Sequence, residues 1–141
     1  MGEQPYVIEP ATATQIAHFR KAGRAGQARR IVEGLLRPDA AEYPMEYPVT
    51  TELAFDSPEY DAALSAFYDH WADRLRTLSA QADVVVLCEG DPFFYGSFMY
   101  LYARLAPRYD VTVIPGVSSL MACATRMGAP FTSRRGTSCA K

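Results

Sequence analysis

The sequence predicts an α/β fold in which helices flank a parallel sheet. Residues 84–88 are apolar and rich in β-branched side chains, which is typical of a short strand buried on both faces. A polar loop follows, and apolar residues then recur at helical spacing over 97–106, where Pro107 ends the pattern. A second short strand at 111–114 and a helix that starts near Ser118 repeat this order. Strand, loop and helix repeated in this way need a crossover connection and hence parallel strands.

Each of these two predicted strands ends in a polar loop, EGDPFFYGS after the first and PGVSS after the second. Because parallel strands have their carboxyl ends at one edge, where ligands of open α/β sheets bind, the two loops predict a common pocket. The alternative is that glycine and proline merely form turns. Glu89 and Asp91 flank Gly90 in a tight loop, which favours a turn or a ligand hydrogen bond over paired acid–base catalysis. No residue is identified as a catalytic base.

The rest of the chain predicts mainly helices. Residues 11–19 form a weak helical pattern, and 27–37 a stronger one that Pro38 ends. Residues 45–51 read as a short strand or an extended loop. A long helix is expected from a Ser57 cap to Ser79, with its aromatic stripe packed in the core.

Basic side chains are concentrated between residues 20 and 30, where the sequence has no acidic residue. The residues concerned are Arg20, Lys21, Arg24, Arg29 and Arg30. They form either a solvated basic face or a set of cations that meets the carboxylates of an anionic substrate. The sequence does not single out one of them.

Composition narrows the class of protein. The chain has 141 residues, of which 49% are hydrophobic and 21% charged, as in an ordinary globular domain. A net charge of −2 gives no general attraction to nucleic acid or anionic membranes. We expect no membrane span, no secretory signal and, from unpaired cysteines, a cytoplasmic location. His18 and His70 have no ligand partner at metal-binding spacing, so no metal site is expected.

Four segments together resemble the tetrapyrrole methylase family, whose members use S-adenosylmethionine (SAM). They are GRAGQARRIVEGLL, MEYPVTTE, CEGDPFFYGSF and VIPGVSS, in this order. Within the family they look most like the precorrin-2 C(20)-methyltransferases of cobalamin biosynthesis. The resemblance therefore implies methyl transfer from SAM to precorrin-2, an anionic tetrapyrrole. The alternatives are a methylase for another precorrin or for uroporphyrinogen III, and a truncated chain without activity of its own.

The resemblance also implies which residues bind the cofactor. Glu89, Gly90 and Asp91 would line the SAM site, and Phe94 would close over it. Ser118 and Ser119 would form the opposite wall at the start of a helix. The structural alternatives are that Phe94 is a core residue and that Ser118 is only a helix cap.

The resemblance covers only part of the family's length. Residues 19–132 correspond to a partial N-terminal domain. Residues 1–18 form a divergent segment without the family's opening G-x-G-P-G-D-P loop, and 133–141 are a polar tail. By this resemblance we expect the chain to correspond to an N-terminal half without the family's second domain, and we expect the complete protein to be a homodimer, as is usual in the family.

Overall fold

The computed structural model describes residues 12–48 and 57–128. The predicted tail 133–141 and positions 1–11 of the predicted N-terminal segment lie outside these described residues. The elements are β1 (Gln15–Arg20), α1 (Gln27–Ile31), β2 (Ala41–Glu46), α2 (Pro58–Ser79), β3 (Val84–Leu87), α3 (Phe98–Leu105) and α4 (Ser119–Met127). No helix in the described part is long and apolar enough to cross a membrane.

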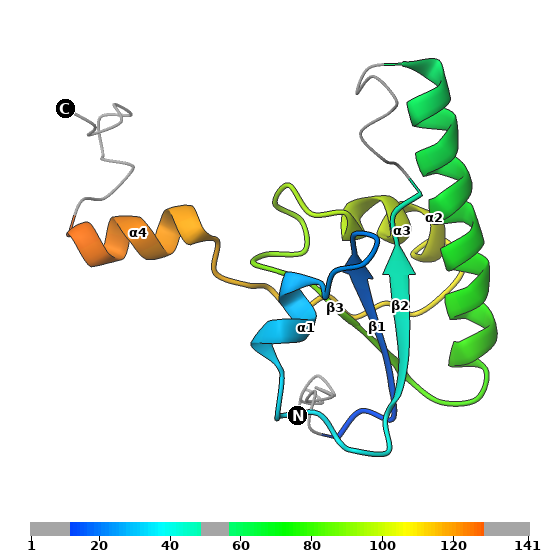
Figure 1. Cartoon of the computed structure of the whole chain (residues 1–141), viewed down its shortest axis with the longest axis horizontal. Coiled ribbons are helices and arrows are strands. Elements are labelled where there is room, and N and C mark those ends of the chain that lie inside the picture. Colours follow the sequence, from blue (N-terminus) through cyan, green and yellow to red (C-terminus); the bar gives the residue numbers. More distant parts are fainter. Residues whose placement is uncertain (1–11, 49–56, 129–141) are drawn as a thin grey trace, which may run out of the picture.

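The three strands form one parallel sheet in the order β2-β1-β3 (Figure 1). Gln15 pairs with Ala41 on one side and with Val84 on the other, so the three parallel strands begin at the same level and have their carboxyl ends at the same edge of the sheet. The predicted parallel α/β fold is confirmed.

Alternate residues of the strands pack into two separate clusters, one on each face of the sheet. On one face, Ala17 and Val86 pack with residues of α2 and α3. On the other face, Ile16 and Leu87 pack with Ala28 of α1 and with apolar residues that follow it. Figure 1 accordingly shows α1 in front of the sheet and α3 behind it. This period of two is what a sheet covered on both faces requires.

The prediction of a weak helix over 11–19 is wrong. Within the described residues this segment contains most of β1, the central strand, in which Ile16 and Ala17 are fully buried. Ladder hydrogen bonds to both neighbours override a weak local preference, because a central strand satisfies all its backbone groups by pairing.

Two further boundaries differ from prediction. The helix predicted over 27–37 ends at Ile31, and Gly34 then adopts a left-handed φ of 82° that a helix does not contain. The short strand or extended loop predicted over 45–51 overlaps only the end of β2, which begins at Ala41 and includes Pro44; positions 49–51 lie outside the described residues. A proline is tolerated there because β2 is an edge strand.

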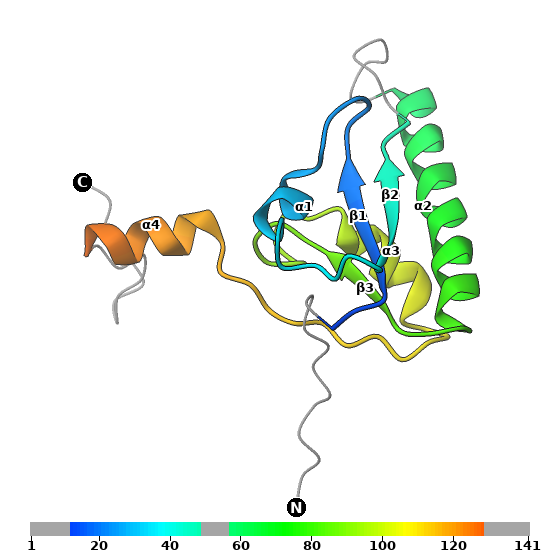
Figure 2. The same ribbon diagram turned by 60° about the horizontal axis from the view of Figure 1, so that its bottom comes forward.

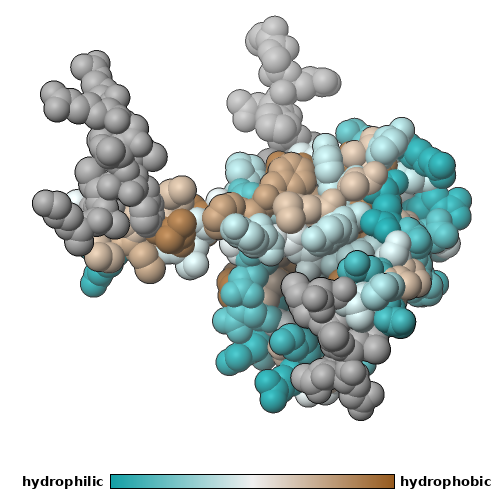
Figure 3. All heavy atoms as spheres, turned by 90° about the horizontal axis from the view of Figure 1, so that it is seen from above, coloured by the Kyte–Doolittle hydropathy of each residue, from teal (hydrophilic) through white to brown (hydrophobic). Residues whose placement is uncertain are grey.

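The strand predicted at 111–114 is not formed. Val111 and Val113 pack against the core of the α2 and α3 face, but this segment has no strand hydrogen bonds. It leads to α4, which stands apart from the sheet in both ribbon views (Figure 2). Figure 3 shows hydrophobic side chains along α4 and along the connection to it, where Val117 and Met127 are more than 70% exposed.

The long helix α2 follows its prediction. Ser57 caps its N-terminus by accepting a hydrogen bond from the backbone N–H of Tyr60, and Pro58 occupies the first turn. Phe67, Leu75 and Leu78 of the predicted stripe are buried.

Candidate functional site

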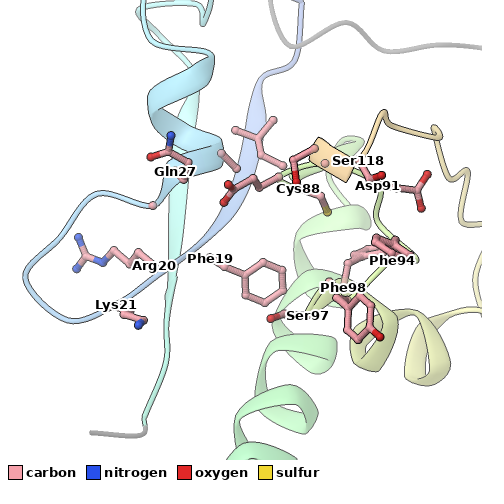
Figure 4. Close-up of a pocket in the computed structure, with 18 of the residues that line it drawn as sticks. Phe19, Arg20, Lys21, Gln27, Cys88, Asp91, Phe94, Ser97, Phe98 and Ser118 are labelled. Atoms are coloured by element: carbon pink, nitrogen blue, oxygen red, sulfur yellow. The ribbon is translucent and has the colours of Figure 1, made fainter. Parts of the chain in front are cut away.

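A cavity of about 840 Å³ lies at the carboxyl edge of the sheet (Figure 4). Its lining comes from the ends of all three strands, from the loop between β1 and α1, and from the loops that precede α3 and α4. The volume falls within the range of about 300–1,000 Å³ that is usual for small-molecule sites.

The cavity opens where the chain leaves neighbouring strands in opposite directions. After β1 the chain turns to α1 on one face of the sheet, and after β3 it turns to α3 on the other face. The two loops therefore diverge and leave a crevice between them. This is the topological switch point at which open α/β sheets bind ligands.

All six residues predicted for the cofactor site line this one cavity. They are Glu89, Gly90, Asp91, Phe94, Ser118 and Ser119. The first four follow β3, and the two serines lie at the start of α4, so the fold brings together residues that are about 25 positions apart.

The carboxylate of Asp91 joins the two predicted loops. Its Oδ1 accepts a hydrogen bond of 2.9 Å from the backbone N–H of Phe93, and its Oδ2 accepts one of 3.0 Å from the N–H of Gly116. Asp91 thus stabilises the turn that contains it, as one of the two predicted roles required. The same side chain also connects the loop after β3 to the loop before α4. Hydrogen bonds to a carboxylate are stronger than those to a neutral acceptor.

The two loops also touch through their backbones. A β-carbon added to Gly116 would lie 2.1 Å from the carbonyl oxygen of Gly90, so only glycine permits this approach. Gly90 itself has a φ of 69°, and a β-carbon added there would meet no atom within 4 Å. The space over Gly90 is therefore open to a ligand.

The sequence matches the family of Tetrapyrrole (Corrin/Porphyrin) Methylases over residues 11–140. The chain belongs to this family. It is 47% identical to a precorrin-2 C(20)-methyltransferase of Sinorhizobium sp over 84% of its own length and 49% of that protein. It is 41% identical to the cobalamin biosynthesis protein CobIJ of Mycobacterium bovis and of Mycobacterium tuberculosis, over 74% of this chain and 21% of those proteins. The chain thus spans half or less of the length of these relatives.

In this tetrapyrrole methylase the residues around the cavity form a polar and aromatic surface. Ser118 caps α4 by accepting a hydrogen bond of 3.3 Å from the N–H of Met121, so its role as a helix cap is present. Phe94 is 47% exposed, so the alternative that it is a core residue is wrong. Its ring contacts that of Tyr95, whose φ of 53° is rare outside glycine.

The lining of the cavity also contains hydroxyl groups that were not among the predicted site residues. The hydroxyl of Tyr47, just after β2, donates a hydrogen bond to Oγ of Ser97, just before α3. Burial raises the pKa of Tyr47 well above its ordinary value, so this phenol stays protonated and acts as a donor. Burial also raises the pKa of the nearby Cys88 thiol to about 11, which makes this cysteine a poor nucleophile at neutral pH.

The loop between β1 and α1 also lines the cavity. Its place at the end of a strand was not predicted, because the sequence pattern favoured a helix over residues 11–19. Phe19, Arg20, Lys21 and Arg24 line the cavity from this side. Gly23 and Gly26, just before a helical pattern, are the sequence signal that marks such a loop.

Within the described residues, no group of three or more His, Cys, Asp or Glu side chains is arranged to hold a metal ion.

Proposed function

We propose that this chain takes part in SAM-dependent methyl transfer to carbon 20 of precorrin-2, a step of cobalamin biosynthesis. The observation that carries the proposal is that all six residues expected at a methylase cofactor site line one cavity at the switch point of the sheet. The identity of 47% to a precorrin-2 C(20)-methyltransferase supports the choice of substrate.

The cavity fits a bound cofactor. The open space over Gly90 is a cradle that any side chain at this position would fill. Exposed backbone of the Glu89–Asp91 turn can approach a ligand closely, and the exposed ring of Phe94 offers an apolar surface beside it. We propose Glu89, Gly90, Asp91, Phe94, Ser118 and Ser119 as the residues that hold SAM.

The chemistry divides between cofactor and protein. SAM, when bound, supplies an activated methyl group, so the protein needs no strong acid or base to generate the electrophile. The chain contributes position: Asp91 fixes the two loops relative to each other through its hydrogen bonds to Phe93 and Gly116. Because a displacement reaction requires the reacting atoms in line, a rigid pair of loops accounts for a large part of the rate.

We further propose a cytoplasmic location and, for the complete enzyme, a homodimer. Free thiols at Cys88 and Cys123 agree with a reducing compartment.

The test is calorimetric titration of the chain with S-adenosylhomocysteine, compared between two leucine variants. Gly90 and Gly34 both have a positive φ and open space where a β-carbon would lie, but only Gly90 lines the cavity. The same backbone strain thus applies to Gly90→Leu and Gly34→Leu. We expect saturable binding by the wild type and Gly34→Leu, and at least a tenfold loss in Gly90→Leu.

Equal binding by the two variants would refute the proposed cofactor site. If binding is found, turnover of precorrin-2 by the same chain tests the reaction. Absence of binding by a folded wild-type chain would show that these loops do not form a cofactor site by themselves.

A further inference from the structure

Three cations line the same cavity as the proposed cofactor loops. Arg20, the last residue of β1, and Lys21 and Arg24, in the loop that follows it, line the cavity. In Figure 4, Arg20 and Lys21 lie on the other side of the opening from Asp91 and Phe94. The cavity is therefore polarised, since Asp91 lies on one side of the opening and Arg20 and Lys21 lie on the other.

These cations are incompletely paired. Lys21 and Arg24 are exposed, and neither has an ion pair with another residue in the described ranges 12–48 and 57–128. Arg20 is held by Glu46 through a contact of 2.7 Å at one terminal nitrogen, whereas its buried Nε has no hydrogen-bond partner. The donor groups of a structural arginine are normally either hydrogen-bonded within the protein or exposed to water. The Nε of Arg20 is buried and has no partner, so it meets neither condition.

The loop that carries the cations is fixed in place. A β-carbon added to Gly26 would lie 1.9 Å from the carbonyl oxygen of Phe19, so the loop returns tightly against the end of β1. The N–H of Arg24 donates to the carbonyl oxygen of Lys21 at 3.2 Å, which closes a turn between the two basic residues. Two cations held on one turn lose little backbone freedom when they bind an anion.

We propose that Lys21 and Arg24, with Arg20 behind them, form a carboxylate-binding wall for the acidic side chains of the tetrapyrrole substrate. This inference rests on the proposed function, because it assigns the substrate side of the same cavity. SAM also carries a carboxylate, but a single one, and Asp91 and Phe94, which are proposed to hold SAM, lie across the opening from Arg20 and Lys21. Several cations on one loop match a substrate that presents several carboxylates.

The test uses uroporphyrin, a stable tetrapyrrole with carboxylates on every pyrrole ring, as the probe, and follows binding by its fluorescence. The variant is Lys21→Ala/Arg24→Ala. The matched control is Arg30→Ala/Arg108→Ala, which removes the same charge from two exposed positions outside the cavity. Circular dichroism shows whether both variants are folded.

We expect the cavity variant to bind uroporphyrin about tenfold more weakly than the wild type, which is the effect of losing two solvent-exposed ion pairs. Added salt should weaken the wild type more than the variant, and coproporphyrin, with half as many carboxylates, should bind less tightly. The control variant should match the wild type in every measurement.

Titration with S-adenosylhomocysteine separates this inference from the proposed function. Unchanged S-adenosylhomocysteine affinity in the cavity variant, together with weakened uroporphyrin binding, supports the wall. If the cavity variant loses only S-adenosylhomocysteine binding, the cations belong to the cofactor site and the inference is overturned. Equal uroporphyrin affinity in the cavity variant and the control variant would overturn it as well. If the wild type binds uroporphyrin through these residues but no S-adenosylhomocysteine, the wall stands and the proposed cofactor site fails.

Discussion

Single backbone atoms decide the shape of the cavity. The loops after β3 and before α4 meet where Gly116 lies against the carbonyl oxygen of Gly90, and Asp91 adds a hydrogen bond to the Gly116 N–H. A side chain at Gly116 conflicts with main chain rather than with the flexible end of a side chain. The two loops must therefore separate if Gly116 is replaced.

We accordingly expect Gly116→Ala to weaken S-adenosylhomocysteine binding by about tenfold or more, because the methyl group displaces one wall of the cavity. Gly128→Ala is the control, since Gly128 also lies next to α4 but its added β-carbon meets nothing within 4 Å. Calorimetric titration measures both. An equal effect of the two substitutions would contradict the importance of the loop contact.

We expect His18 to make the stability of the fold depend on pH. It is 5% exposed on β1, and burial lowers the pKa of its imidazole below 6.5, although the nearby Glu42 carboxylate partly offsets this effect. Glu42 is itself held by Arg29 of α1 through contacts of 2.6 and 2.9 Å. The neutral imidazole thus lies beneath an ion pair that fastens α1 to the sheet.

Protonation of His18 should destabilise the fold. Because its pKa is lower in the folded state, the unfolded chain binds the proton first, and stability falls as pH decreases below 6.5 toward the folded pKa. His18→Gln, which cannot protonate, should show a shallower decrease in the free energy of unfolding between about pH 7 and pH 5. Urea unfolding at several pH values measures the slopes. Parallel slopes for the two proteins would show that another group causes the loss.

At the scale of whole elements, a serine N-cap begins both α2 and α4, but only α2 is packed on the core. α2 and α4 both begin after a serine whose side chain accepts a hydrogen bond from the helix N-terminus. α2 then buries one face in the core, whereas no residue of α4 is buried. Most of the stability of a protein helix comes from packing of its apolar face, so the two caps are not equivalent.

We expect Ser57→Ala to lower the free energy of unfolding by about 1 kcal/mol, the usual cost of losing an N-cap. Ser118→Ala should leave the global unfolding transition unchanged and reduce only the helix content, because α4 is not packed on the core. Denaturation followed by circular dichroism tests both substitutions. A comparable shift of the unfolding midpoint in Ser118→Ala would show that α4 belongs to the cooperative unit.

At the scale of the molecule, the described chain divides into a packed sheet with its helices and a distal helix. The strand ends and the loops after β1 and β3 carry most of the cavity lining, and the start of α4 adds Ser118 and Ser119. The apolar side chains along α4 are exposed, including Leu120, Met121 and Met127. The part of the site contributed by α4 is therefore held mainly by the loop contact between Gly90 and Gly116.

Hydrogen exchange should reveal this division. We expect the amides of α4 to exchange much faster than those of β1, since a nine-residue helix is marginal without packing and a central strand opens only on global unfolding. Saturating S-adenosylhomocysteine should slow exchange in residues 89–97 and 116–121. Mass spectrometry of peptic fragments measures both effects. Equal protection of α4 and β1 in the free chain would contradict the conclusion that α4 is not packed on the sheet.

The sequence by itself determined the strand at 84–87, the helices that follow it and the capped helix α2, whereas the six residues expected at the cofactor site were implied by the resemblance to the family. These features depend on signals a few residues long, such as an apolar run, a serine cap or a glycine loop. The cofactor role of the six residues stays a prediction, although the fold brings them to one cavity.

Only the tertiary structure decided that residues 15–20 form the central strand and that residues 111–114 form none. Both outcomes depend on backbone partners far away in the chain: β1 has a strand on each side, whereas residues 111–114 have no ladder partner in the described part. The basic loop became a wall of the cavity for the same reason, because its position follows from the end of β1. Local propensity does not encode such pairing, and the pairing brought Lys21 and Arg24 to the cavity that Asp91 also lines.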